Sequence, residues 1–343
     1  MLIIGPRNWT KVAAAEWYGR RQGKAVSTIE GVADMGYAQT STAEINYGDN
    51  VPDDVRGVIE KSVETLVGRA AERMEKQRAL RSRHEEFRAA EKEHYRRQIE
   101  GDPESARAFD AARKRLSSVE LNNGLADAEP LDAQLVRTAG MFKFGNATKI
   151  FWAPFHYTWH WSNHEGTYSL SDGMAVGSPG NNGYAGISAA VSTDVAWLDA
   201  HAGVGVAFTV ADVNSSTPVF VMGRSLRWVR KEYSVLAAPG NGDATTEGGV
   251  ELTVLEGGNL VTVASNKMWR ERRSNGEIAQ GGGLAEGFQL DPTLEVLWTM
   301  QPGRVYTMNL GVWTTVDCDD GIYGDSGAYG YIDSNIGALS LFK

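Results

Sequence analysis

Apolar and polar positions follow two different periods along this chain, and the period changes near residue 120. Between residues 52 and 119, apolar side chains recur every three or four positions among many charged ones and glycine is rare, which predicts α-helix. Between residues 140 and 343, apolar side chains come in short runs rich in valine, threonine and tryptophan and separated by glycines, which predicts β-strands. The chain therefore joins a helical part to an all-β part.

A long helix is predicted to begin at Pro52, because proline suits the first turn and Asp53 and Asp54 lie near the positive end of the helix dipole. One apolar stripe runs along it and requires a partner surface: Val55, Ile59, Val63, Leu66, Ala70 and Met74. Beyond this stripe, Leu80, Phe87 and His94 keep a seven-residue spacing among charged neighbours. That spacing is typical of a coiled coil with a weak seam or of a solvated helix.

Gly101 and Pro103 interrupt this helix, since glycine ends a helix and proline begins the next one. A second helix with a narrow apolar face is predicted to return antiparallel to the first: Ala106, Phe109, Ala112, Leu116 and Val119. We therefore expect a helical hairpin or coiled coil over residues 51–120, after an N-terminal arm of residues 1–50 and before a linker of residues 121–140. The pattern leaves open whether the helices pack on their own β domain or on another chain.

Residues 141–343 are predicted to form an antiparallel β-sandwich of jelly-roll type, because about ten short strands alternate with turn clusters and no helical pattern intervenes. The strand-like runs cover residues 150–152, 155–161, 204–210, 219–222, 226–230, 250–255, 260–263, 294–298, 305–310 and 336–342. Turn clusters such as Gly240–Asp243 and Glu256–Asn259 separate them. The expected fold class is thus an α+β multidomain protein with an N-terminal helical hairpin and a β-sandwich body.

Composition and charge limit the classes of function that the chain can have. With 42% apolar and 22% charged residues, the chain of 343 residues is typical of a globular protein. A formal net charge of −9 argues against nucleic acid as a partner, since that affinity comes from excess lysine and arginine. The single cysteine, Cys318, excludes an internal disulfide. The apolar run near Met1 is too short for a secretory signal peptide, so we expect synthesis in the cytoplasm.

Two groups of side chains are candidates for binding. Tyr157, Trp159 and Trp161 alternate along one strand and share one face of it. If exposed, they would form a platform for sugar rings or a partner surface; if buried, they would form half of the sandwich core. Arg227 and Arg230 belong to a local basic patch that can contact anionic sugars, lipid head groups or an acidic subunit, or form salt bridges within the protein.

Acidic side chains near the C-terminus are candidates for a metal site. Asp317, Asp319, Asp320 and Asp325 gather on a glycine-rich loop, and calcium prefers several such oxygens. The spacing does not match an EF-hand, and a solvated acidic loop is the simpler interpretation. We therefore expect no cofactor, with calcium as the one candidate ion.

Three histidines of one predicted strand are separated by four residues each: His156, His160 and His164. Four strand residues span roughly 13 Å, so the three rings cannot converge on one zinc ion. The pattern leaves their role open. No P-loop, dinucleotide fingerprint or HExxH motif is present in the sequence, which favours a protein that is not an enzyme.

The order of arm, helical hairpin and β-sandwich resembles appendage proteins of phage tails and contractile injection machines. The resemblance covers the order of elements and no diagnostic motif. It implies a non-enzymatic structural or attachment protein in a homo-oligomer or larger assembly, associated with a virion or injection particle. Two alternatives stay open: a pore-forming or membrane-active toxin that acts on a membrane surface, and a carbohydrate-binding module whose partner is a glycan.

Overall fold

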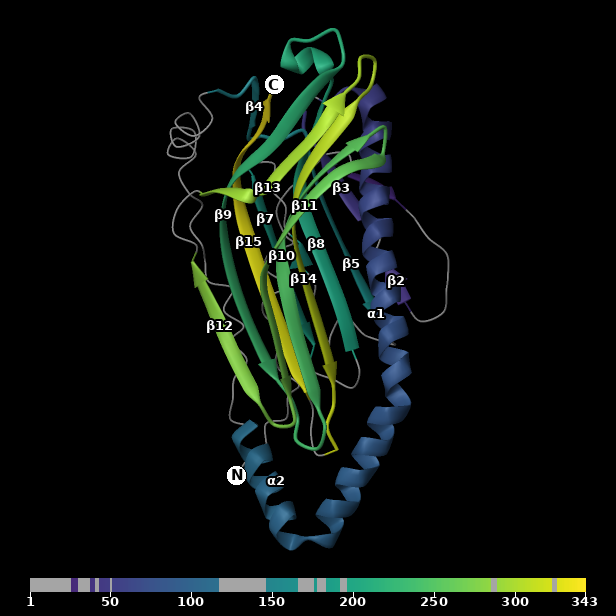
Figure 1. Ribbon diagram of the computed structural model, residues 1–343, viewed down its shortest axis with the longest axis vertical. Helices are drawn as coiled ribbons and strands as arrows, with labels where there is room; N and C mark the ends of the chain where they lie inside the picture. Colours follow the sequence, from purple (N-terminus) through teal and green to yellow (C-terminus); the bar gives the residue numbers. More distant parts are fainter. Residues whose placement is uncertain are drawn as a thin grey trace.

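The computed structural model describes residues 26–29, 38–40, 43–49, 51–116, 146–165, 176–177, 183–191, 196–284, 289–322 and 326–343. Two antiparallel β-sheets pack face to face, and one long helix lies along the outside of the first sheet (Figure 1). The predicted antiparallel sandwich is confirmed. The jelly-roll connectivity stays a prediction.

Sheet A has the strand order β1-β3-β5-β8-β14-β10-β11, with β2 paired to β5. Its strands are β1 (Val26–Ile29), β2 (Ala38–Thr40), β3 (Ala43–Tyr47), β5 (Tyr157–Glu165), β8 (Ala196–Phe208), β10 (Asp243–Glu256), β11 (Asn259–Ser274) and β14 (Tyr306–Asp319). Part of the predicted N-terminal arm therefore supplies strands at one end of this sheet. The predicted linker of residues 121–140 lies outside the described residues.

Sheet B has the order β12-β9-β15-β7-β6, with β13 paired to β9 and β4 paired to β15. Its strands are β4 (Lys149–Trp152), β6 (Val176–Gly177), β7 (Tyr184–Val191), β9 (Val219–Leu236), β12 (Ile278–Leu284), β13 (Gln289–Met300) and β15 (Gly327–Phe342). A 3-10 turn, η1 (Val210–Val213), follows β8.

Alternating side chains of each strand fill the space between the sheets, as the period of two requires. On β8, for example, Leu198, Ala200, Ala202, Val204 and Val206 all belong to the buried cluster between the sheets. The intervening residues of β8 face the other way, toward the outer surface of sheet A. Two of these are Gly203 and Gly205, where an added Cβ would overlap the rings of Trp159 and Tyr157. Glycine on β8 thus leaves room for the aromatic side chains of β5.

The first half of α1 (Asp53–Gly101) covers this outer face of sheet A. The predicted stripe is buried on the sheet: Ile59, Val63 and Ala70 are fully buried, and Leu66 and Met74 are nearly so. Ile59, Val63, Leu66 and Ala70 share one apolar cluster with Ile45, Tyr157, Trp159, Trp161 and Leu255. Burying each large aliphatic side chain stabilises this packing by about 1.5–3 kcal/mol.

The helical hairpin or coiled coil predicted over residues 51–120 is therefore not supported. The helix does end at Gly101, and α2 (Pro103–Leu116) begins after Asp102, whose carboxylate accepts hydrogen bonds from the backbone N–H groups of Glu104 and Ser105. However, α1 buries its stripe against the aromatic face of β5 in its own sheet. Neither described helix has an apolar stretch long enough to span a membrane.

Candidate functional site

The aromatic side chains of β5 lie beneath α1. Tyr157 is fully buried, and Trp159 and Trp161 are each 4% exposed. They are therefore no exposed platform. The expectation that, once buried, they would form half of the sandwich core is wrong, because they face α1 on the outer side of sheet A. Parity along β5 was predictable from the sequence, but not which face of the sheet a helix would cover.

One amide oxygen holds two of these side chains in place. The Tyr157 hydroxyl donates to Oδ1 of Asn309 at 2.6 Å, and Nε1 of Trp159 donates to the same oxygen at 3.2 Å. Burial raises the pKa of the Tyr157 phenol far above its ordinary value, so the hydroxyl remains a donor. The sequence signal for Asn309 was an amide side chain between the apolar residues Met308 and Leu310, and it was missed.

A ring stack extends from β5 to β8. Trp159 stacks on Trp161 with 4.7 Å between ring centroids, and Trp161 stacks on His201 at 4.8 Å. Nε2 of His201 lies 2.7 Å from a carboxylate oxygen of Asp199, and Thr315 donates its hydroxyl to the other oxygen at 2.9 Å. In a nucleophile–base–acid relay, the hydroxyl would hydrogen-bond to the histidine. Here His201 and Thr315 both contact the Asp199 carboxylate and not each other, so the group is not such a relay. It is a buried polar network that fixes the stack.

A small cavity lies between α1 and the outer face of sheet A. It is lined by Leu66, Arg73, Trp159, Trp161, His201, Glu251, Thr253, Gly311, Val312 and Trp313. Its volume of about 20 Å³ holds one water molecule. Nε1 of Trp161, Nε1 of Trp313 and the hydroxyl of Thr253 are buried without a hydrogen-bond partner among the described residues. A water molecule in the cavity would accept hydrogen bonds from these donors. A sugar ring is too large for the cavity.

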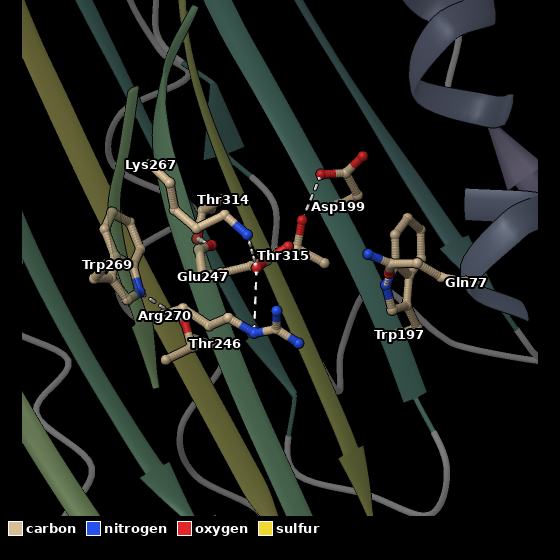
Figure 2. Close-up of polar contacts among 10 residues, drawn as sticks. All are labelled: Gln77, Trp197, Asp199, Thr246, Glu247, Lys267, Trp269, Arg270, Thr314 and Thr315. Atoms are coloured by element: carbon tan, nitrogen blue, oxygen red, sulfur yellow. Dashed lines mark hydrogen bonds and ion pairs between the residues drawn. The ribbon is translucent and has the colours of Figure 1, made fainter. Parts of the chain in front are cut away.

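Charged side chains of β10 and β11 pair with one another across the two strands (Figure 2). Glu247 accepts Nζ of Lys267 at 2.6 Å and lies 3.7 Å from Nε of Arg270. At the edge of the helix, Nε1 of Trp197 donates to Oε1 of Gln77 at 3.1 Å. The Glu247 ion pairs therefore hold β11 on β10, and the hydrogen bond from Trp197 to Gln77 holds α1 on β8.

The predicted basic binding residues lie inside the protein. Arg227 is 4% exposed and Arg230 is 6% exposed. Nη2 of Arg230 donates to the Tyr331 hydroxyl at 2.7 Å and lies 3.1 Å from Oδ2 of Asp333, which is fully buried. Burial raises the pKa of Asp333 above its ordinary value, and Arg230 opposes that rise. Of the two interpretations of this basic patch, a salt bridge within the protein is the one that holds for Arg230.

The predicted metal residues are occupied by other contacts where the structure describes them. Oδ1 of Asp319 accepts Nζ of Lys92 at 2.8 Å, and Oδ1 of Asp320 accepts the backbone N–H of Ser326 at 2.5 Å. One carboxylate oxygen of Asp317 is buried, and Asp325 lies outside the described residues. Within the described ranges, no three His, Cys, Asp or Glu side chains gather to hold a metal ion. A calcium site that includes Asp325 stays a prediction.

The histidines of β5 and its start are separate from one another. Nδ1 of His156 accepts the backbone N–H of Ala207 at 3.0 Å, and Nε2 of His160 lies 3.6 Å from a carboxylate oxygen of Glu44. Burial lowers the pKa of both His156 and His160. The side chain of His164 lies outside the described set.

No protein-family model and no curated protein matches this chain. One matching solved structure is the carbohydrate-binding module TmCBM61 in complex with β-1,4-galactotriose. It is 11% identical with a TM-score of 0.13, and the match covers 51% of this chain and 90% of that chain. At this identity and TM-score, the likeness carries no argument about the fold or the ligand of this protein.

Proposed function

We propose that this protein is a non-enzymatic structural or attachment protein and a subunit of an oligomeric assembly of the phage-like or injection-machine kind. In this proposal the sandwich is the body. The part that docks on a neighbouring subunit is the helical extension, which we define as residues 93–116: the end of α1 and all of α2.

The observation that carries the proposal is that α1 is anchored at both ends of the sandwich and then continues past it. Its stripe is buried on sheet A, Oε2 of Glu91 accepts Nδ2 of Asn241 at 3.0 Å, and Lys92 pairs with Asp319 at 2.8 Å. Beyond Lys92 the helix runs past the ends of both sheets before the chain reverses into α2 (Figure 1). A rigid helix fixed to a body in this way is suited to reach a neighbour.

Among the described side chains of the helical extension, Ile99 is the only large apolar one that is buried. The side chains of Arg96 and Arg97 are 52% and 75% exposed, and both pair with Glu93 within one turn. Such pairs each contribute about 0.2–0.5 kcal/mol, and isolated helices shorter than about 12–15 residues are marginal in water. The 14 residues of α2 also carry an amphipathic pattern. A partner that covers the exposed face of α2, which includes Ala108 and Ala111, would stabilise the extension.

Light scattering at several concentrations tests the proposal on the full chain. Ala108 and Ala111 are exposed on α2, so replacing both by arginine adds bulk to the surface without opposing helix formation. We expect the wild type to form species whose masses are multiples of 37.3 kDa, and A108R/A111R to lose the larger ones. The matched control is A89R/A90R, which alters exposed alanines of α1 before the extension begins.

If A108R/A111R assembles like the wild type at every concentration, the helical extension is not the attachment element and the proposal is wrong. Negative-stain images of the same samples show whether assemblies have a closed symmetry, as homo-oligomers usually do.

A further inference from the structure

Exposed apolar side chains gather along one edge of the sandwich. Among the described residues, seven large apolar side chains are exposed, and three of them lie close together on β11. We call these three the apolar edge: Leu260, Val261 and Val263 of β11, which are between 37% and 40% exposed. Leu297 of β13 and Phe220 of β9 do not belong to it, because their neighbours Val296, Trp298 and Val221 fill the core between the sheets and turn these two side chains to the outer face of sheet B.

The strand that carries the apolar edge is an edge strand. In the described part of sheet A, β11 is terminal and pairs with β10 alone. The unpaired backbone groups of such a strand are a template for another strand. The two halves of β11 differ, because Lys267, Arg270, Arg272 and Arg273 charge the second half whereas residues 259–266 contain no charged side chain. Charge protects one half from pairing and leaves the other open.

We propose that residues 259–267 of β11 pair antiparallel with the same segment of a second copy of this chain, and that the apolar edge is buried in the resulting dimer. An antiparallel pair of identical strands is self-complementary, since each copy donates to and accepts from the other through the same positions. Two sheets A then become one continuous sheet across a twofold axis.

The positions of the charged residues favour one register of this pairing. With the twofold axis at Val263, Asn259 of one copy lies opposite Lys267 of the other. Asn259 is uncharged, so this register places no like charge opposite Lys267, whereas an axis nearer the charged half of β11 would bring the basic residues of the two copies together. Lys267 is 45% exposed and Glu256 is 31% exposed, and each keeps its ion pair within its own copy, with Glu247 and Arg304 respectively.

A strand suits this edge better than a lipid surface does. A bilayer would cover the apolar side chains but would leave the backbone N–H and C=O groups of β11 without partners, which is unfavourable in hydrocarbon. A second β11 satisfies the side chains and the backbone together. The dimer does not depend on the helical extension, because none of its contacts includes residues 93–116.

Two variants and one control test the pairing on the full chain by sedimentation at several concentrations. V261K/V263K places like charges on both copies at the axis, and we expect it to weaken dimerisation at least a hundredfold. I278K adds the same charge to an equally exposed residue of β12 outside the apolar edge and leaves the dimer unchanged. Melting curves that match the wild type show that the lysines leave the fold intact. A108R/A111R also keeps this dimer, which separates the pairing from attachment through the helical extension.

Disulfide trapping tests the register. Cys318 is the only cysteine and is 1% exposed, so V263C introduces the single accessible thiol. Under mild oxidation V263C should form a covalent dimer, and I278C should not. The proposal is overturned by a wild-type monomer at all concentrations, by a V261K/V263K dimer as strong as the wild type, or by flotation of a monomer with anionic phospholipid vesicles that V261K/V263K abolishes.

Discussion

The hydroxyl of Tyr157 donates a 2.6 Å hydrogen bond to the side-chain oxygen of Asn309, between strands that are not neighbours in sheet A. The bond passes over β8 at Gly205, where an added Cβ would overlap the Tyr157 ring. It therefore ties β5 to β14 beneath α1, and the surface on which α1 rests depends on it.

Replacing Asn309 by leucine removes the acceptor of two buried donors, the Tyr157 hydroxyl and Nε1 of Trp159. A buried group left without its partner costs about 1–3 kcal/mol, so we expect the free energy of unfolding to fall by about 2–4 kcal/mol. Urea unfolding followed by tryptophan fluorescence measures the change. Q301L, at an exposed loop position, serves as the control. An N309L protein as stable as Q301L would show that the shared acceptor is dispensable.

The stripe of α1 should be far more sensitive to truncation than the exposed part of the same helix. Ile59 is fully buried on sheet A, and Phe87 is 64% exposed. We expect I59A to lower the free energy of unfolding by about 2–5 kcal/mol, because it leaves a cavity. F87A should change it by less than about 0.5 kcal/mol, as usual for a surface site. Equal effects would mean that α1 does not pack on its own sheet.

Removing one partner of the Arg230–Asp333 pair should cost more than removing both. In R230M the Asp333 carboxylate loses its cation in a fully buried position, and we expect a loss of about 3–5 kcal/mol. R230M/D333L should recover much of this loss, since no charge remains to be buried. Chemical denaturation of the two variants gives the comparison. A double variant less stable than R230M would contradict the assignment of the pair as a buried charge.

The same pair predicts the direction of a pH dependence. Burial raises the folded-state pKa of Asp333 above the unfolded value, and losing Arg230 removes the effect that opposes the rise. A group with a raised folded pKa contributes stability at low pH that is lost as the pH rises through that pKa. The free energy of unfolding of R230M, relative to the wild type, should therefore decrease from acid toward neutral pH. An increase over that range would refute the prediction, and R230M/D333L should show no such trend.

The thiol of Cys318 should report on global unfolding. Because Cys318 is 1% exposed and belongs to the core between the sheets, we expect its reaction with a thiol reagent to be slow in buffer and to accelerate in urea at the unfolding midpoint. The rate of thiol labelling, measured at a series of urea concentrations, tests this. Fast labelling in buffer would mean that β14 opens locally.

Much of the local structure could be read from the spacing of residues. The stripe from Val55 to Met74, the break at Gly101 to Pro103 and the alternation of Tyr157, Trp159 and Trp161 each depend on neighbours along the chain. Propensity and period therefore predicted the helix, its end and the face shared by the three aromatics. The acidic loop and the arginines of β9 could not be assigned in the same way. Burial and the partners of Arg230 and Asp319 depend on strands and helices far away in the sequence.

The sequence by itself determined that a charged helical part precedes an antiparallel β-sandwich, because hydrophobic period and turn residues are local properties. Only the tertiary structure decided that α1 covers the outer face of sheet A, that Trp159 and Trp161 lie beneath it, and that β11 ends the sheet. The reason is physical: an apolar stripe requires burial but does not specify the surface that buries it. The choice between α2, another chain and the aromatic face of β5 depended on which surface fitted the stripe in three dimensions.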